Sequence, residues 1–570
     1  MPVTLRQACQ GRAEVLRRSG SALLLITLLA LLLRVLRLDF QPLWWDEGYS
    51  LYFATNSIAE MVVQTARDIH PPLYYALLHG WISLFGPSPV AVRLLSVTIG
   101  VLAVPLVSVA GRLLASPRVG LLAALLLAIN PLHIFYSQEV RMYGLVALLG
   151  LISTTCAAEL FNTQHVIRNT QYATGNTQHA IRNTQYAIRN TLSCSVFRVA
   201  CIWCAYILAT TAALYTQYYA AFIPLAHTLF ALWHWRRAPR RLARWLGAQL
   251  LIGLAYLPWL LYAAPKLVPY VAQKVVKDAD RPLGLLAYFG RHLAAFAAGH
   301  LEGPLAAWWW LGLLVLPFIA WGLWLQVAGC KSQVAGRNHP NYHSANVPIC
   351  QSTSLMLITL FLPLALGFML NLRYPFFPER GERLMLLVLP PFVLLGAMAL
   401  ERLLGRGQAR INTDGMVNPR SSAFVRVLNS GKIPHRVGWL ALGVFVLLSG
   451  LSLGGFYTVP RYADDDYRPL IARVRELARP DDVVFCVFPW QVGYFRAYAP
   501  DGPQIVSSPS PAWGGEVRQA LNTPLAMGRH LWFPAHLALG GVLEGAIERH
   551  LLSTAYPLVN EWYGPNTRLL

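Results

Sequence analysis

Two neighbouring carboxylates, Asp46 and Glu47, directly follow a pair of tryptophans, Trp44 and Trp45. Acidic side chains at a membrane surface are costly unless they are hydrated, paired or useful. Because residues i and i+1 point to different faces of a helix, we expect separate jobs, one carboxylate facing a cavity and the other a structural partner. A carboxylate can take the proton from an acceptor hydroxyl. Asp46 and Glu47 are therefore the predicted catalytic residues.

Polar and aromatic side chains recur in the segments 70–75, 130–143, 215–219 and 373–383. Guanidinium groups bind phosphate through paired hydrogen bonds, and aromatic rings can stack on sugar rings. Together with a general base, this set suits transfer from a phosphate-bearing lipid. The predicted phosphate ligands are Arg141, Arg373, Arg380 and Arg383. The side chains predicted to line the substrate cavity are His70, Tyr74, Glu139, Tyr143, Gln217 and Tyr218.

The sequence contains no clear set of metal ligands. Cys201 and Cys204 have CxxC spacing, but they lie inside an apolar run with no second pair nearby. Small apolar packing residues are the favoured interpretation of this pair. We therefore assign no metal and no certain cofactor, and a divalent cation is left open.

The composition indicates where these residues are held. Of the 570 residues, 55% are apolar and only 13% are charged, whereas a soluble globular chain carries about 25% charged residues. The net charge of +21 could suggest nucleic acid, but the basic residues lie mainly between apolar runs, as in the cluster 236–244. Loops with this bias face the cytoplasm. We predict a multi-pass protein of the cell (plasma or inner) membrane with no nucleic-acid partner.

The predicted topology places the polar segments on one side of the membrane. The arginines near the N-terminus keep that end inside, so the first span, 21–38, exits outward and leaves 39–92 outside. About 20 apolar residues are needed for each span, which gives about eleven spans and an extracytoplasmic C-terminus. The other predicted spans are 93–114, 119–137, 142–161, 197–215, 218–235, 245–264, 305–327, 354–372, 383–402 and 438–458.

The chain is thus predicted to be an α-helical polytopic domain over 1–458 followed by a small extracytoplasmic α/β domain over 459–570. In the latter, hydrophobic patterns predict helices at 467–478, 515–522 and 541–552 and strands at 483–488, 503–507 and 530–533.

Three cytoplasmic stretches, 162–196, 328–352 and 403–437, have the composition of low-complexity insertions. In the first, each seven-residue repeat opens with Asn-Thr-Gln, which favours turns over helices. We do not expect these stretches to carry the chemistry.

Four motifs occur in a fixed order: WWDEGYSLYFA, DIHPPLYYALLHGWISLFG, RLLSVTIG and INPLHIFYSQEVRMYGL. Over about residues 20–230 they resemble the N-terminal half of GT-C glycosyltransferases, in the bacterial branch similar to protein O-mannosyltransferases and lipid A aminoarabinose transferases. The later segment RYPFFPERGERLMLLVLPP looks like the arginine-bearing outer loop of that family.

The resemblance implies a GT-C type fold, a polyprenyl-phosphate sugar as donor, and inversion of the anomeric centre. It implies that Asp46 activates the acceptor with Glu47 as its partner, and that His70 lines the cavity. Glu139, Arg141 and Tyr143 match the motif at the outer end of the third and fourth spans. Many relatives carry His-Tyr where this chain has Gln217-Tyr218, so Gln217 is not expected to titrate.

The predicted function is a membrane glycosyltransferase that acts on the extracytoplasmic face. Its partners would be the lipid-linked donor, membrane lipids, and an acceptor that is a lipid, a glycan or a protein. One alternative is a lipid or polysaccharide transporter, which usually has polar residues on broken helices near the midplane and internal repeats. The other is a surface-polysaccharide ligase or polymerase, which lacks an Asp-Glu loop after the first span.

Overall fold

The computed structural model divides into two compact units. The helical unit contains Met1–Arg34, Ile99–Tyr136 and Tyr143–Phe456, and the mixed unit contains Val35–Thr98, Ser137–Met142 and Tyr457–Leu570. The residues that the structure describes are 3–174, 181–278, 281–335, 347–375, 380–405, 432–538 and 541–570.

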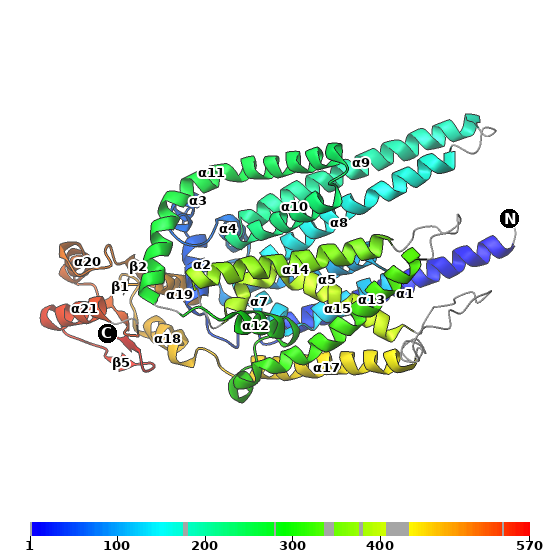
Figure 1. Cartoon of the computed structure of the whole chain (residues 1–570). Coiled ribbons are helices and arrows are strands. Elements are labelled where there is room, and N and C mark those ends of the chain that lie inside the picture. The colour runs from blue at the N-terminus through cyan, green and yellow to red at the C-terminus, as the bar shows by residue number, and fades with distance from the viewer. Residues whose placement is uncertain are drawn as a thin grey trace. The chain divides into compact units, whose positions relative to one another are not determined.

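Helices make up the helical unit, and its longest ones, such as α8, α9, α14 and α17, run in roughly the same direction (Figure 1). In chain order its helices are α1 (Val3–Val35), α5 (Pro89–Leu114), α6 (Pro117–Ala128), α7 (Pro131–Ser137), α8 (Tyr143–Thr174), α9 (Ile181–Leu214), η1 (Tyr218–Ala221), α10 (Phe222–His234), α11 (Pro239–Asp278), α12 (Leu285–Ala298), η2 (Gly303–Val315), α13 (Leu316–Ala335), α14 (Val347–Arg373), η3 (Gly381–Val388), α15 (Leu389–Leu404) and α17 (Lys432–Thr458). The first turns of α5 belong to the mixed unit.

Eight described helical segments are long and apolar enough to cross a membrane. They correspond to eight of the predicted spans. The predicted span 119–137 is a pair of helices, α6 and α7, bent by 60°. The predicted spans 21–38 and 218–235 correspond to shorter helices, the apolar part Ser19–Val35 of α1 and the helix α10. By length and composition the described part of the chain therefore contains eight spans, or nine with the bent pair, so the predicted count of about eleven is unconfirmed.

A buried arginine stabilises the bend between α6 and α7. Pro131 lacks the N–H that would continue α6. The Asn130 side chain accepts a hydrogen bond from the His133 N–H in the first turn of α7. Arg34, fully buried, donates to the carbonyls of Leu127 and Ala128 and to His133 Nδ1. A guanidinium at the end of α6 satisfies carbonyls that the broken helix leaves open.

The mixed unit combines short helices with two small sheets. Its helices are α2 (Trp45–Ala54), α3 (Ile58–Thr65), α4 (Leu73–Phe85), η4 (Ala463–Asp465), α18 (Arg468–Leu477), α19 (Pro489–Tyr498), α20 (Gly515–Ala526) and α21 (Val542–Thr554). Its strands are β1 (Val483–Cys486), β2 (Gln504–Ser507), β3 (Leu531–Trp532), β4 (Pro534–His536), β5 (Glu561–Trp562) and β6 (Thr567–Leu569).

The strands form a parallel sheet in the order β2-β1-β3 and an antiparallel sheet in the order β4-β6-β5. The central strand β1 is buried throughout, as its continuous apolar run predicts. Its Phe485 belongs to a hydrophobic core that also contains Val517, Leu521, Phe533 and Ile547.

Helices α2 and α19 of the mixed unit cross with their backbones in contact. A Cβ added to Gly48 would lie 2.7 Å from the Trp490 carbonyl oxygen, and one added to Gly493 would lie 2.0 Å from the Gly48 carbonyl oxygen. Only glycine permits such a close approach. The contact matters because α2 carries Asp46 and Glu47 at its first turn.

The repeat region and the C-terminal segment differ in part from the sequence predictions. In the repeat region, α8 continues to Thr174 and α9 begins at Ile181, although turns were expected; a helix already nucleated in an apolar span extends at little cost through weak formers. Helix α19 and the strands β4, β5 and β6 were not predicted. Of the other predicted insertions, 336–346 and 406–431 lie outside the described residues, as does 376–379.

Candidate active site

Glu47 lies in a fully buried ion pair with Arg93. Its side chain is 0% exposed, and the Arg93 Nε and NH2 donate to the two carboxylate oxygens at 3.0 and 2.7 Å. The same carboxylate accepts from the backbone N–H groups of Trp44 and Val140. These contacts are the ones expected for the member of the acidic pair that faces a structural partner. Because the Glu47 carboxylate is fully buried, it is not exposed to a substrate. These surroundings are those of a residue that positions its neighbours, and a catalytic role for Glu47 stays a prediction.

Arg93 also fixes the chain that leads into α2. Its NH1 donates to the carbonyls of Leu38 and Gln41, and its NH2 donates to the carbonyl of Pro42. Arg93 begins the RLLSVTIG motif but was not among the predicted site residues. A buried charge needs a partner of opposite sign. If Glu47 is the buried member of the acidic pair, a basic residue must lie beside it, and this requirement was the signal in the sequence that could have indicated Arg93.

Asp46 has a different environment from its neighbour. It lies in the first turn of α2, where the helix dipole favours a negative charge. Its side chain is 25% exposed, and its Oδ2 lies 3.6 Å from the Arg141 NH2. The Arg141 NH1 also donates to the Asp46 carbonyl. The carboxylate is thus held from one side and open on another, which is the geometry that a general base needs.

Arg141 links Asp46 to a second acid through a histidine. The Arg141 NH2 donates to His70 Nε2 at 3.0 Å, so this nitrogen is the acceptor and Nδ1 carries the proton. The Nδ1 then donates to Asp68 Oδ2 at 3.2 Å. Asp68, which the sequence analysis missed, stands two residues before His70 in the DIHPPL motif. The result is a continuous chain of contacts from Asp68 through His70 and Arg141 to Asp46.

Burial and the neighbouring charges shift the pKa values of His70 and Asp68. Burial lowers the pKa of His70, and the Arg141 guanidinium lowers it further. Burial opposes ionisation of Asp68, but the His70 ring and a hydrogen bond from the Ile69 N–H outweigh it and lower the pKa of Asp68. At neutral pH the histidine is therefore neutral and the aspartate is charged.

These contacts bear on the predicted role of Arg141 as a phosphate ligand, which stays a prediction. The side chain is only 3% exposed, and its two terminal nitrogens bond His70, Asp46 and Ser50. A ligand for a lipid phosphate would need donors that reach a cavity. Arg141 is better placed to orient Asp46.

The remaining predicted residues of the mixed unit are buried. Tyr74 is 0% exposed and hydrogen-bonds Ser96 at 3.0 Å, so it does not line a cavity. Glu139 is 4% exposed and lies beside the Glu47–Arg93 pair in a small pocket that Trp44 also lines. Only Asp46 combines support with exposure among the predicted residues of this unit.

The predicted phosphate ligands in the helical unit have three different environments. Arg373 is exposed at the last residue of α14, with its guanidinium 4.8 Å from the Tyr374 ring centre. Arg383 is 7% exposed and lies near the Tyr143 ring. Arg380 pairs with both oxygens of Glu302 at 3.1 and 3.3 Å. A carboxylate already compensates the charge of Arg380, so Arg373 is the stronger phosphate candidate.

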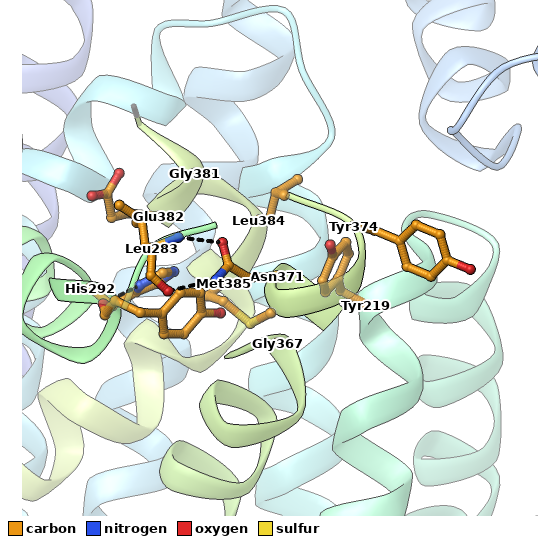
Figure 2. Close-up of a pocket in the computed structure, with 11 residues that line it drawn as sticks. Tyr219, Leu283, His292, Gly367, Asn371, Tyr374, Gly381, Glu382, Leu384 and Met385 are labelled. Carbon is orange, nitrogen blue, oxygen red and sulfur yellow. Dashed lines mark hydrogen bonds between the residues drawn. The ribbon is translucent and has the colours of Figure 1, made fainter. Parts of the chain in front are cut away.

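Gln217 and Tyr218 make local structural contacts in this unit. The Gln217 amide donates to the Leu384 carbonyl at 3.4 Å and is 3% exposed. The Tyr218 hydroxyl accepts from the Trp259 indole at 3.3 Å. Neither residue lines the nearby pocket, to which Tyr219 contributes instead, opposite His292 and Glu382 (Figure 2).

The acidic groups do not form a metal-ligand set. Within the described ranges, no three His, Cys, Asp or Glu side chains come together so as to hold a metal ion. Asp46 and Glu47 each face a guanidinium instead.

No protein-family model matches the sequence, and no curated protein matches it either. Among solved structures, the chain is similar to ArnT from Cupriavidus metallidurans in the apo state, with a TM-score of 0.52 and 13% sequence identity over 98% of each chain. ArnT from that organism bound to undecaprenyl phosphate gives a TM-score of 0.48 at 14% identity, covering 96% of this chain and 97% of that chain.

The archaeal oligosaccharyltransferase AglB from Archaeoglobus fulgidus, in complex with an inhibitory peptide and a dolichol-phosphate, gives a TM-score of 0.48 at 12% identity. The match covers 90% of this chain and 69% of that chain. At these sequence identities the comparisons show the fold alone. The match to ArnT in the apo state covers 98% of this chain. This chain is a multi-pass membrane protein with the fold of the GT-C glycosyltransferases.

Proposed function

We propose that the protein is a glycosyltransferase that moves a sugar from a polyprenyl-phosphate donor to an acceptor on the extracytoplasmic face, with inversion at the anomeric carbon. One observation carries the proposal: two adjacent carboxylates have opposite environments. Glu47 is sealed in an ion pair, whereas Asp46 is oriented by Arg141 and remains 25% exposed. That division is what a supported general base requires.

In the proposed step, Asp46 takes the proton from an acceptor hydroxyl or amine as that oxygen or nitrogen attacks C1 of the sugar. The bond between C1 and the phosphate oxygen breaks, and its electron pair leaves with polyprenyl phosphate. Arg373, exposed at the end of α14, is the proposed partner of the leaving phosphate. General-base catalysis contributes about 10²–10⁴-fold in rate, and stabilisation of the leaving charge adds to it.

Asp46→Asn tests the proposal because it keeps the shape of the side chain and removes the base. Membranes with the variant are incubated with a panel of radiolabelled polyprenyl-phosphate sugars, and both transfer and release of polyprenyl phosphate are measured. We expect activity to fall by about 10²-fold or more, while Asp39→Asn, at an exposed carboxylate, retains it. An Asp46→Asn enzyme with normal donor-dependent turnover would reject the role.

The broken span favours one second candidate, a lipid-sugar transporter. The bend between α6 and α7, with the buried Arg34 and His133 beside it, is a feature found in transporters. Proteoliposomes separate the two functions. A transporter would move the intact lipid-linked sugar across the bilayer, whereas a transferase would release polyprenyl phosphate only when an acceptor is present.

A further inference from the structure

The helical unit contains a second polar cavity, of about 270 Å³, between α12, η2 and the start of η3. The cavity lies near the first residues of two span segments, Gly303–Ala328 and Gly381–Leu404. The predicted topology places these ends of the two segments on the extracytoplasmic side. Its charged and aromatic lining residues are Arg291, His300, Glu302, Trp309, Arg380 and Glu382.

The formal charges of the cavity balance. The two arginines face two glutamates, and the NH2 of Arg380 donates to both carboxylate oxygens of Glu302. A phosphate group would meet two carboxylates in this space and be repelled. A neutral ligand with many hydroxyl groups would instead find both donors and acceptors.

Glu382 contributes a carboxylate to the lining of the cavity. The residue is 6% exposed, and its Oε2 has no hydrogen-bond partner among the described residues. Buried polar atoms are nearly always satisfied, so an open carboxylate oxygen beside a cavity indicates a ligand or ordered water. Figure 2 shows this carboxylate pointing away from Asn371 and Tyr219.

The rest of the lining gives the cavity a flat aromatic wall and a small-residue floor. The Trp309 ring lines it, with the Arg291 guanidinium 5.8 Å from the ring centre. Ala294, Ala295, Gly299 and Ala306 leave room. Gly299 has φ +70°, and an added Cβ would lie 2.6 Å from the Pro131 side chain.

The wall around His300 is held in place by its neighbours. The Tyr136 hydroxyl bonds His300 Nε2 at 2.9 Å, and the Ser452 hydroxyl donates to the His300 carbonyl at 3.1 Å. A preformed wall lowers the entropic cost of binding.

We infer that this cavity binds the ring of a saccharide. The carboxylates of Glu302 and Glu382 accept hydrogen bonds from sugar hydroxyls, the guanidinium groups donate to ring and hydroxyl oxygens, and the Trp309 indole stacks on the ring's apolar face. The inference rests on the proposed function. The saccharide is the sugar of the lipid-linked donor or a sugar of the acceptor, and the experiment distinguishes these sources.

Two adjacent alanines allow a matched steric test. Ala306 lines the cavity and Ala307, the next residue, does not, and both are exposed. Ala306→Trp fills the space, Ala307→Trp is the control, and Glu382→Gln removes the open acceptor with little change in shape. The full-length variants are assayed in nanodiscs for KM toward the polyprenyl-phosphate sugar and toward the acceptor.

We expect Ala306→Trp to raise one of these KM values by about tenfold, the factor that corresponds to one strong interaction, with a smaller rise for Glu382→Gln and none for Ala307→Trp. A rise for the donor assigns the cavity to the donor sugar, and a rise for the acceptor assigns it to the acceptor. Unchanged values for both substrates would overturn the inference and leave the transferase proposal intact.

The inference remains testable if no polyprenyl-phosphate sugar is transferred and the proposed function fails. Saturation-transfer NMR with a panel of methyl glycosides then measures binding to the same proteins. Signals that disappear in Ala306→Trp and persist in Ala307→Trp support a saccharide site. Equal signals in the two variants, or no signal from the unmodified protein, reject it.

Discussion

Asp46 and Glu47 are separated by one peptide bond, and their carboxylates have opposite surroundings. Sequence alone predicts that such neighbours point to different faces, and the structure shows which one is buried. The sequence could not supply the partners of these carboxylates, because Arg93 is 46 residues from Glu47 and Arg141 lies 95 residues from Asp46. Pairing over such distances depends on the fold.

The buried pair gives a prediction for stability. Glu47→Gln leaves the charge of Arg93 buried without its counter-charge, and breaking such a pair costs about 3–5 kcal/mol. We expect a large drop in the thermal unfolding temperature of the detergent-solubilised protein. Glu516→Gln, at an exposed carboxylate, is the control and should unfold like the unmodified protein. Equal unfolding temperatures for Glu47→Gln and the unmodified protein would contradict the assignment.

His70 and Asp68 give a prediction for pH dependence. Burial and Arg141 lower the pKa of His70, so the unfolded chain takes up its proton at a higher pH than the folded one does. Stability contributed by the neutral ring is therefore present above the unfolded pKa of about 6.5 and decreases as the pH falls below it. Asp68, whose pKa is also lowered, loses its contribution in stronger acid.

We expect the unfolding temperature to fall between about pH 6.5 and pH 5, and we expect His70→Gln to remove most of that slope, because glutamine can still accept from Arg141 but does not titrate. Unfolding of both proteins is followed across this range. If the variant loses stability on acidification as steeply as the unmodified protein, other groups control the transition.

At the scale of elements, the predictions were best where one pattern fills a whole element. The helix α18 and the strands β1, β2 and β3 all lie within predicted ranges, because apolar runs bounded by turn residues mark them. Helix α19 was missed, since it begins with Pro489-Trp490 and crosses α2 through a close backbone contact at Gly493. No local periodicity specifies that contact.

The glycine crossing gives a prediction for this contact. Gly493→Ala places a methyl group 2.0 Å from the Gly48 carbonyl oxygen, so the two helices must separate. Overpacking costs about 1–3 kcal/mol, and displacement of α2 also displaces Asp46. We expect a lower unfolding temperature and reduced transfer. Gly515→Ala, at a position with open space around it, is the matched control; equal effects from both substitutions would show that the crossing is not critical.

At the scale of the molecule, composition over about 20 residues is a strong signal, and eight predicted spans correspond to described helices. The signal is weaker where a span is broken or short, as in α6 with α7 and in α10. The predicted division at residue 458 rests on the order of elements along the chain. The C-terminal segment shares its compact unit with Val35–Thr98 and Ser137–Met142, and the division of a chain into interleaved units cannot be read from local patterns.

The predicted orientation can be tested by labelling. In a background without native cysteines, a cysteine at the exposed position Asn560 should react with a membrane-impermeant maleimide added to intact cells. A cysteine at the exposed position Arg237 should react only after the membrane is opened. The reverse pattern would place the acidic pair on the cytoplasmic side and defeat the proposed reaction.

The hydrogen bond from the Leu43 N–H to the Tyr498 hydroxyl joins residues 455 positions apart in the chain. During synthesis at about 5–20 residues per second, the segment carrying Asp46 therefore waits on the order of tens of seconds before its packing partner leaves the ribosome. A nascent chain that stops early would be inserted in the bilayer with its acidic helix unsupported. Under the proposed function, such a precursor would lack a correctly held Asp46, so competence would follow the completion of translation.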